Sequence, residues 1–207
     1  FDQVDMDVEY DIPGRADNSN ELKQSFYLPS LNLRYDLNDQ HILRLGASKT
    51  YTLPQSKEIS PYQYVNIGFA SEGNPNLKPS DNYNLDLKWE YYMTNSELIS
   101  LTGFYKRIEN PIGRVDKGNS AGLLTYDNIS DYADVMGAEL EIRKNIFDRR
   151  NLELNRSNKL SFGLNASILY TDLVLKLENT PERSSGLEGA SPMIINTDLT
   201  YQLSNQN

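Results

Sequence analysis

Acidic side chains near the N-terminus have a spacing that could support metal chemistry. Asp5, Asp7, Glu9 and Asp11 alternate along the chain, and calcium takes carboxylate oxygens as ligands. The helix–loop–helix calcium site requires glycine at its sixth position, where this chain has Tyr10. Carboxylates two residues apart on a strand share one face. We therefore interpret the run as the polar face of a strand and expect no metal site.

Three other features bear on catalysis. Glu139 and Glu141 could form the pair of acids of a glycosidase, but no pattern of aromatic subsites accompanies them, so we prefer a polar strand face and keep the glycosidase as a third alternative. His41 is the single histidine, too few for a zinc site or a Ser-His-Asp triad. Cysteine is absent, which excludes thiolate metal sites and disulfides. We expect no enzyme and no cofactor.

Composition restricts the partners. The net charge is −9 at pH 7 and no basic stripe exists, which argues against nucleic acid. With 207 residues and 38% hydrophobic content, the chain can bury a core. Its 14 tyrosines, against 6 phenylalanines and 1 tryptophan, suit boundaries between apolar and wet surroundings. No apolar run reaches the ~18 residues that a transmembrane helix needs.

The elements that position these residues are strands. From Tyr83 to Tyr91, odd positions are apolar or aromatic and even positions are polar, so one strand face is apolar and the other polar. A tilted strand crosses a bilayer with ~9–11 residues, and several segments reach that length with aromatics at the ends of their apolar sets, as in a membrane girdle.

The same alternation recurs along the chain. It predicts about eight strands: 4–10, 31–37, 43–47, 83–91, 99–105, 138–142, 160–170 and 195–203. A polar loop is expected up to about Lys23, long loops over 53–80, 108–131 and 171–191, short turns at 38–40 and 94–96, and a medium connection over 147–158. Outer-membrane barrels alternate short periplasmic turns with long extracellular loops. The predicted fold is all-β, with antiparallel up-and-down strands that form part of a large transmembrane β-barrel.

The sides of this wall also follow from the alternation. Leu45, Leu87, Leu101, Leu140, Leu164 and Leu199 are expected to face lipid, and Arg44, Lys88, Glu139 and Asn165 to face the lumen. A wide barrel has a wet interior in which mixed charges pair or stay hydrated. A solvated sheet face would look the same, so a soluble β-sandwich that binds carbohydrate or another ligand remains the main alternative.

Residues 45–112 resemble the late barrel region of TonB-dependent outer-membrane receptors of the Bacteroidetes type. The resemblance rests on Pro61-Tyr62-Gln63-Tyr64, on Gly73–Pro79, on the Tyr/Trp-rich strand after it and on Phe104-Tyr105-Lys106. Where the family usually has Arg-Pro, this chain has Leu53-Pro54. In the motif residues Gly73, Asn74, Pro75, Leu77, Lys78 and Pro79 we expect a structural role. Gly73 would supply unusual dihedral angles, the prolines extended backbone, and Leu77 an anchor at the rim.

The resemblance implies a barrel of 22 strands closed by an N-terminal plug, in the bacterial outer membrane. It implies contact with outer-membrane lipid, uptake of a scarce siderophore, vitamin, glycan or peptide, and coupling to the TonB complex through the plug. Residues 1–207 are expected to be a fragment of one barrel domain, because Phe1-Asp2-Gln3-Val4 begins no signal peptide and no plug is present.

Ligand contacts are expected in the long loops, because binding concentrates in loops held by a rigid scaffold. The candidates are Tyr62, Tyr64, Phe69, Arg114, Tyr126 and Arg183.

Overall fold

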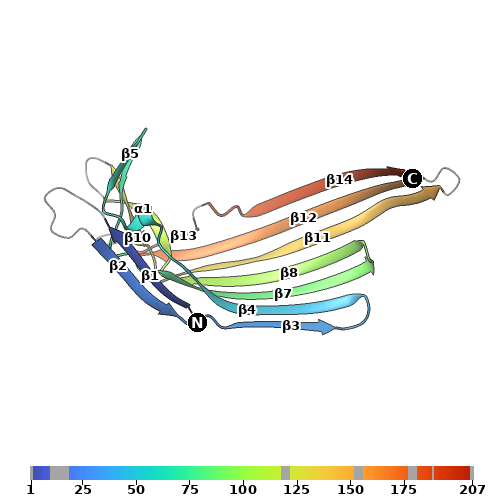
Figure 1. Cartoon of the computed structure of the whole chain (residues 1–207), viewed down its shortest axis with the longest axis horizontal. Helices are drawn as coiled ribbons and strands as arrows, with labels where there is room; N and C mark the ends of the chain where they lie inside the picture. The colour runs from blue at the N-terminus through green and yellow to red at the C-terminus, as the bar shows by residue number, and fades with distance from the viewer. Residues whose placement is uncertain are drawn as a thin grey trace.

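A computed structural model describes residues 2–9, 19–117, 122–151, 156–176, 181–187 and 189–205. Its main element is an eight-stranded antiparallel sheet with strand order β3, β4, β7, β8, β11, β12, in which β13 and β14 both pair with β12 (Figure 1). The strands are β3 (Ser30–Asp36), β4 (His41–Thr52), β7 (Ser80–Thr94), β8 (Glu97–Glu109), β11 (Tyr132–Asn151), β12 (Arg156–Leu175), β13 (Arg183–Ser185) and β14 (Met193–Asn205). The predicted all-β, up-and-down fold is confirmed.

The central strands are longer than the sequence predicted. β7 has 15 residues, β8 has 13, and β11 and β12 have 20 each, all beyond the ~9–11 that a bilayer requires. The prediction of a medium connection over 147–158 is wrong, because β11 and β12 continue through most of it. A register shift between Asn145 and Phe147 conceals the alternation in the sequence.

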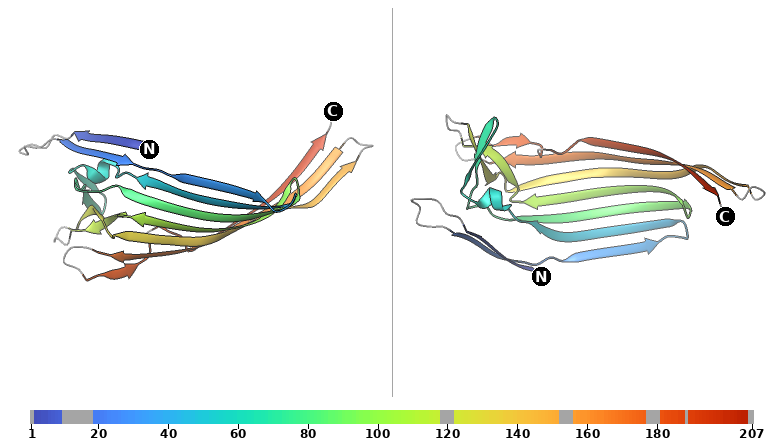
Figure 2. Two further views of the ribbon diagram at one scale, coloured as in Figure 1. Left: turned by 90° about the horizontal axis from the view of Figure 1, so that it is seen from below. Right: turned by 45° about the horizontal axis from the view of Figure 1, so that its top comes forward.

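The two faces of this sheet have opposite chemistry, and the apolar face is the exposed one. Leu87, Leu101 and Leu199 are 55%, 50% and 66% exposed. On the other face, Glu90 and Ser100 are 5% and 2% exposed. The sheet is curved and twisted (Figure 2), and no second layer of described residues covers its leucines. This is the inverse of a soluble sheet, where the apolar face is buried.

Aromatic rings border the apolar face at both ends. At one end the His41 ring stacks on Tyr91 with centroids 4.5 Å apart, and Trp89 stacks on Tyr91 at 6.3 Å. At the other end Tyr83, Tyr105, Tyr132 and Tyr170 lie on β7, β8, β11 and β12. Two such belts around an apolar band are typical of a membrane-spanning barrel wall.

Connections differ between the two ends of the sheet. β3 and β4, β7 and β8, and β11 and β12 are each consecutive in the chain and follow one another at the same end of the sheet, which we name the short-connection end (Figure 1). The long connections gather at the opposite, long-connection end. The described part of the chain contains no helix that could span a bilayer.

The sequence predicted loops in the long connections, but the structure shows regular elements there. They contain α1 (Ser56–Ile59), β5 (Gln63–Asn66), β6 (Phe69–Glu72), β9 (Ile112–Asp116) and β10 (Leu123–Asn128). These four strands form a second sheet in the order β5, β6, β10, β9, in which β6 and β10 run parallel. We name it the cap sheet. Figure 1 places it at the long-connection end.

The N-terminal segment also differs from its prediction. β1 (Asp2–Glu9) pairs with β2 (Ser19–Phe26) in a separate antiparallel hairpin, so part of the expected polar loop is strand. The hairpin is attached to β4, where Phe26 stacks on Tyr51 with centroids 4.0 Å apart and the Tyr51 hydroxyl donates to Asp2 at 2.6 Å. The candidate calcium ligand Asp11 and its neighbour Tyr10 lie outside the described residues.

Candidate functional site

One face of the cap sheet collects four of the six predicted contact residues. In the strand register, Tyr64 pairs with Ser71, Ser71 with Leu124, and Tyr126 with Arg114. Paired residues share a face, and positions two apart on a strand share it too. Tyr64, Phe69, Arg114 and Tyr126 therefore project from the same side, although they come from two separate long connections.

Arg114 is the central polar group of this face. Its guanidinium lies over the Phe69 ring, 5.4 Å from the centroid, which is within the range of a cation–π contact. The side chain is exposed, and no ion pair joins it to a carboxylate of the described residues. A planar cation flanked by aromatic rings can bind a carboxylate or another flat anionic group through paired hydrogen bonds.

A pocket of about 720 Å³ lies between the cap sheet and the end of β12. Arg114 and Tyr126 line it from the cap sheet, and Leu173 and Leu175 line it from β12. Odd positions of β12 belong to the polar face of the main sheet, opposite the exposed apolar set of Leu164, Ile168 and Tyr170. The pocket therefore opens on the polar side of the main sheet, the side a barrel would enclose.

The remaining two candidates lie elsewhere. Tyr62 precedes β5, where its backbone N–H donates to Ser60 at 2.7 Å. Arg183 begins β13, is exposed and pairs with Leu175 in the strand register. The structure therefore brings four of the six residues onto one face, whereas Tyr62 and Arg183 lie outside the strands of the cap sheet.

The motif at 73–79 fixes the cap sheet to the end of the main sheet. The Asn74 backbone N–H donates to Glu58 at 2.6 Å, and its side-chain amide donates to the Tyr126 carbonyl at 2.9 Å. Leu77 is 2% exposed. The expected dihedral role of Gly73 is wrong, since Gly73 is not among the positive-φ glycines. It is required for close approach, because a Cβ there would lie 2.0 Å from the Ser60 carbonyl oxygen.

Sequence reasoning missed several residues that hold this region together. The Asn128 side chain accepts from the Lys78 N–H at 2.9 Å and donates to the carbonyls of Lys78 and Asn110 at 3.0 and 2.9 Å. The Ser130 hydroxyl lies 2.8 Å from the carbonyl oxygens of both Tyr132 and Val174, which share its single proton. Their only sequence signal is the preference of Asn and Ser for local bonds to backbone.

Charge pairs line the polar face of the main sheet. The Glu90 carboxylate accepts from Arg44 at 2.9 Å and lies 3.4 Å from the Lys88 ammonium, and Glu141 pairs with Arg143 at 2.6 Å. These ion pairs, which we name the ion ladder, link β4, β7 and β11. At the long-connection end, a hydrogen bond to Asp131 raises the pKa of Lys176. The described residues contain no group of three or more potential metal ligands.

Comparisons with known proteins agree with this architecture. The family profile described as TonB dependent receptor-like, beta-barrel matches residues 1–206. No curated protein sequence matches the chain. The siderophore receptor PirA from Pseudomonas aeruginosa matches with a TM-score of 0.50 and 18% identity, over 90% of this chain and 36% of that chain.

Two further receptors are similar. A mutant ferric enterobactin receptor, PfeA from Pseudomonas aeruginosa in complex with enterobactin, matches with a TM-score of 0.47 and 18% identity, over 75% of this chain and 26% of that chain. The siderophore receptor PirA from Acinetobacter baumannii matches with a TM-score of 0.43 and 16% identity, over 89% of this chain and 34% of that chain. The chain thus spans 26% to 36% of the length of these receptors. It belongs to the β-barrel family of TonB-dependent receptors, a family of transport receptors in the outer membrane of Gram-negative bacteria.

Proposed function

We propose that this chain forms part of the wall and outer mouth of a receptor that imports a scarce solute, such as a siderophore, vitamin, glycan or peptide. The observation that carries the proposal is the pocket of about 720 Å³ between the cap sheet and β12. Long connections lie at the extracellular end of outer-membrane barrels, so the long-connection end faces outward. The pocket then lies on the inner side of the barrel mouth, where an arriving solute first meets the protein.

The wall is proposed to be completed by strands outside residues 1–207, so that the chain is one fragment of a single barrel domain. β3 has β4 as its partner and no strand on its other side among the described residues, which leaves a backbone edge. Backbone groups in hydrocarbon must be hydrogen-bonded within the protein. In the complete protein, a plug upstream would close the barrel and connect it to the TonB complex.

The two alternative functions lack structural support. A soluble sandwich needs a second layer over the leucines of the main sheet, and no described element lies there. A glycosidase needs two carboxyls facing across a substrate. Glu141 is instead ion-paired with Arg143 at 2.6 Å and with Lys88 at 3.9 Å, as expected of a wall residue. We propose that the chain has no enzymatic activity.

The binding role of the cap sheet is tested by Arg114→Ala in the complete receptor. Losing an anchoring cation should weaken solute binding by about tenfold or more, since hydrogen bonds to charged groups contribute ~1.5–3 kcal/mol. Lys117→Ala is the matched control, because Lys117 projects from the opposite face, 2.9 Å from Glu72. Equal binding by the wild type and the Arg114 variant would remove the cap sheet from the binding site.

A further inference from the structure

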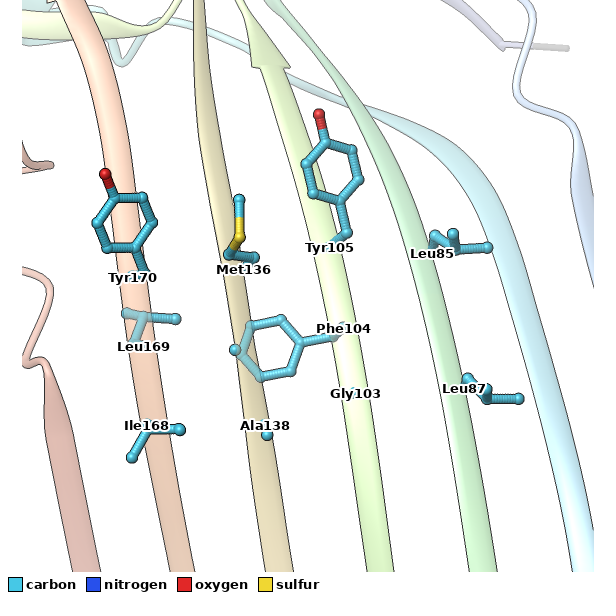
Figure 3. Close-up of a pocket in the computed structure, with 11 residues that line it drawn as sticks. Leu85, Leu87, Gly103, Phe104, Tyr105, Met136, Ala138, Ile168, Leu169 and Tyr170 are labelled. Atoms are coloured by element: carbon cyan, nitrogen blue, oxygen red, sulfur yellow. The ribbon is translucent and has the colours of Figure 1, made fainter.

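The lipid-facing side of the main sheet is not uniformly filled. A hollow of about 620 Å³ lies across β7, β8, β11 and β12 (Figure 3). Its floor is the pair Gly103 and Ala138, which are directly opposite each other on β8 and β11. Leu87 and Ile168 flank the pair on the outer two strands in the same row. Two small residues between two large ones produce a depression that is two strands wide.

The hollow is a property of the wall and not of its open edges. Each of its four strands has a partner on both sides. A Cβ added at Gly103 would meet no atom within 4 Å, so the space above it is empty of protein. In a membrane this space must be filled, because a void forfeits the dispersion contacts of its lining.

Polarity rises in steps from the hollow toward the extracellular end. The next row carries Tyr105 and Tyr170, whose hydroxyls point toward that end in Figure 3. The Tyr105 hydroxyl donates to Asp134 at 2.6 Å, whereas the Tyr170 hydroxyl has no hydrogen-bond partner among the described residues. The row beyond holds Lys49 and Arg107, both on the same face as the tyrosines.

This order matches the layers of a lipid molecule: apolar chain, carbonyl linkage and charged head. Lys49 is 3.1 Å from Asp81, and Arg107 is 2.9 Å from Asp134, so both cations belong to a belt of mixed charge. The hollow extends from the row of Leu87 and Gly103, at the middle of β7 and β8, to the row of Leu85 and Tyr105 on the extracellular side. In the proposed orientation it therefore runs from the midplane into the outer leaflet. In the outer membrane that leaflet is built from lipopolysaccharide.

We propose that the hollow binds one acyl chain of lipopolysaccharide, with the Tyr170 hydroxyl donating to a carbonyl or hydroxyl oxygen near the head of that chain. The inference rests on the membrane orientation proposed above, but not on the solute or on the pocket at the barrel mouth. A chain seated over Gly103 and Ala138 gains contacts on three sides, which a flat wall would not provide.

The test is retention of purified rough lipopolysaccharide by the complete receptor in detergent, without solute, quantified by mass spectrometry after gel filtration. Gly103→Leu and Ala138→Leu fill the hollow and should each lower retention by about tenfold, corresponding to ~1.4 kcal/mol. Ala166→Leu is the matched control, because Ala166 is on the same face but outside the hollow; its retention should equal that of the wild type.

Tyr170→Phe keeps the ring and removes the hydroxyl, so it tests the same site if a leucine variant fails to fold. It should lower retention by about threefold, which corresponds to part of the free energy of one neutral hydrogen bond. Equal retention by folded variants and wild type would overturn the proposal. So would retention of phosphatidylglycerol in a parallel experiment that equals that of lipopolysaccharide and is lost in the same variants. Because no solute is present, failure of solute binding leaves this result unaffected.

Discussion

Arg44 donates from its Nε to Glu90 Oε2 at 2.9 Å, joining β4 to β7 on the polar face of the main sheet. Glu90 is 5% exposed, while Leu87 on the opposite face of the same strand is 55% exposed. In water this arrangement would bury charge and expose hydrocarbon. In a barrel wall it places paired charge toward the wet interior and leucine toward lipid.

The sidedness predicts the effect of a charge at neighbouring positions of β7. Leu87→Arg should destabilise the intact barrel by ~2–4 kcal/mol, because it places a cation in the lipid near the midplane. Lys88→Arg, one residue on, should change stability by less than ~1 kcal/mol, because it keeps a hydrated charge in the lumen. Denaturant unfolding of the receptor in lipid vesicles measures both. Equal costs at the two positions would contradict the assignment of faces.

The ion ladder predicts that Glu90 contributes to the stability of the wall. Glu90→Gln keeps the shape but leaves Arg44 and Lys88 beside a neutral amide, so the barrel should lose ~1–3 kcal/mol. Glu139→Gln is the control, since Glu139 lies on the same face and is exposed. A Glu90 variant as stable as the Glu139 variant would show that water replaces the pairs without cost.

Glycines in the wall should differ in their tolerance of a methyl group. At Gly137, a Cβ would lie 2.3 Å from the Ile168 carbonyl oxygen and 2.6 Å from the Phe104 ring. Gly137→Ala should therefore cost ~1–3 kcal/mol, because backbone must move. At Gly103 nothing lies within 4 Å, and Gly103→Ala should be neutral or stabilising. Thermal unfolding of the two variants compares them directly, and a neutral Gly137→Ala would refute the close packing.

The long connections should decide uptake. Three deletions in the complete receptor test this: the turn between β5 and β6 at 66–68, residues 118–121 between β9 and β10, and residues 177–180 between β12 and β13. We expect at least one deletion to reduce solute uptake by about tenfold, because binding residues are held on such segments. Uptake assays test this expectation. Surface labelling checks that each variant is inserted in the outer membrane. Unchanged uptake in all three deletions would contradict a role of the long connections in uptake.

Much of the wall followed from sequence, because strict alternation over Tyr83–Tyr91 and 160–168 leaves one choice of faces once one face is apolar. The 147–158 error has a local cause, since the shift between Asn145 and Phe147 changes the phase of the alternation. The cap sheet was missed because its strands are only four to six residues long and β6 finds its partner β10 more than fifty residues away. Periodicity over so few residues carries little information.

The site was only partly predictable for the same reason. The sequence predicts Tyr64, Phe69, Arg114 and Tyr126 as contacts only because they lie in long loops, whereas their common face exists because of the β6–β10 and β9–β10 registers. Composition alone could not separate them from Tyr62 and Arg183. The ion ladder at Glu90 could not be predicted, because the alternation within each strand does not show which strands are neighbours.

The central claim, that the exposed leucine face contacts lipid, is tested most directly by spin-label accessibility along β7. The segment contains no cysteine, so single cysteines from Leu85 to Lys88 in the complete receptor can each carry a nitroxide. Accessibility to oxygen, which concentrates in lipid, should peak at positions 85 and 87. Accessibility to a water-soluble nickel chelate should peak at 86 and 88. Profiles that are in phase, or that place the chelate maximum at 85 and 87, would contradict the account.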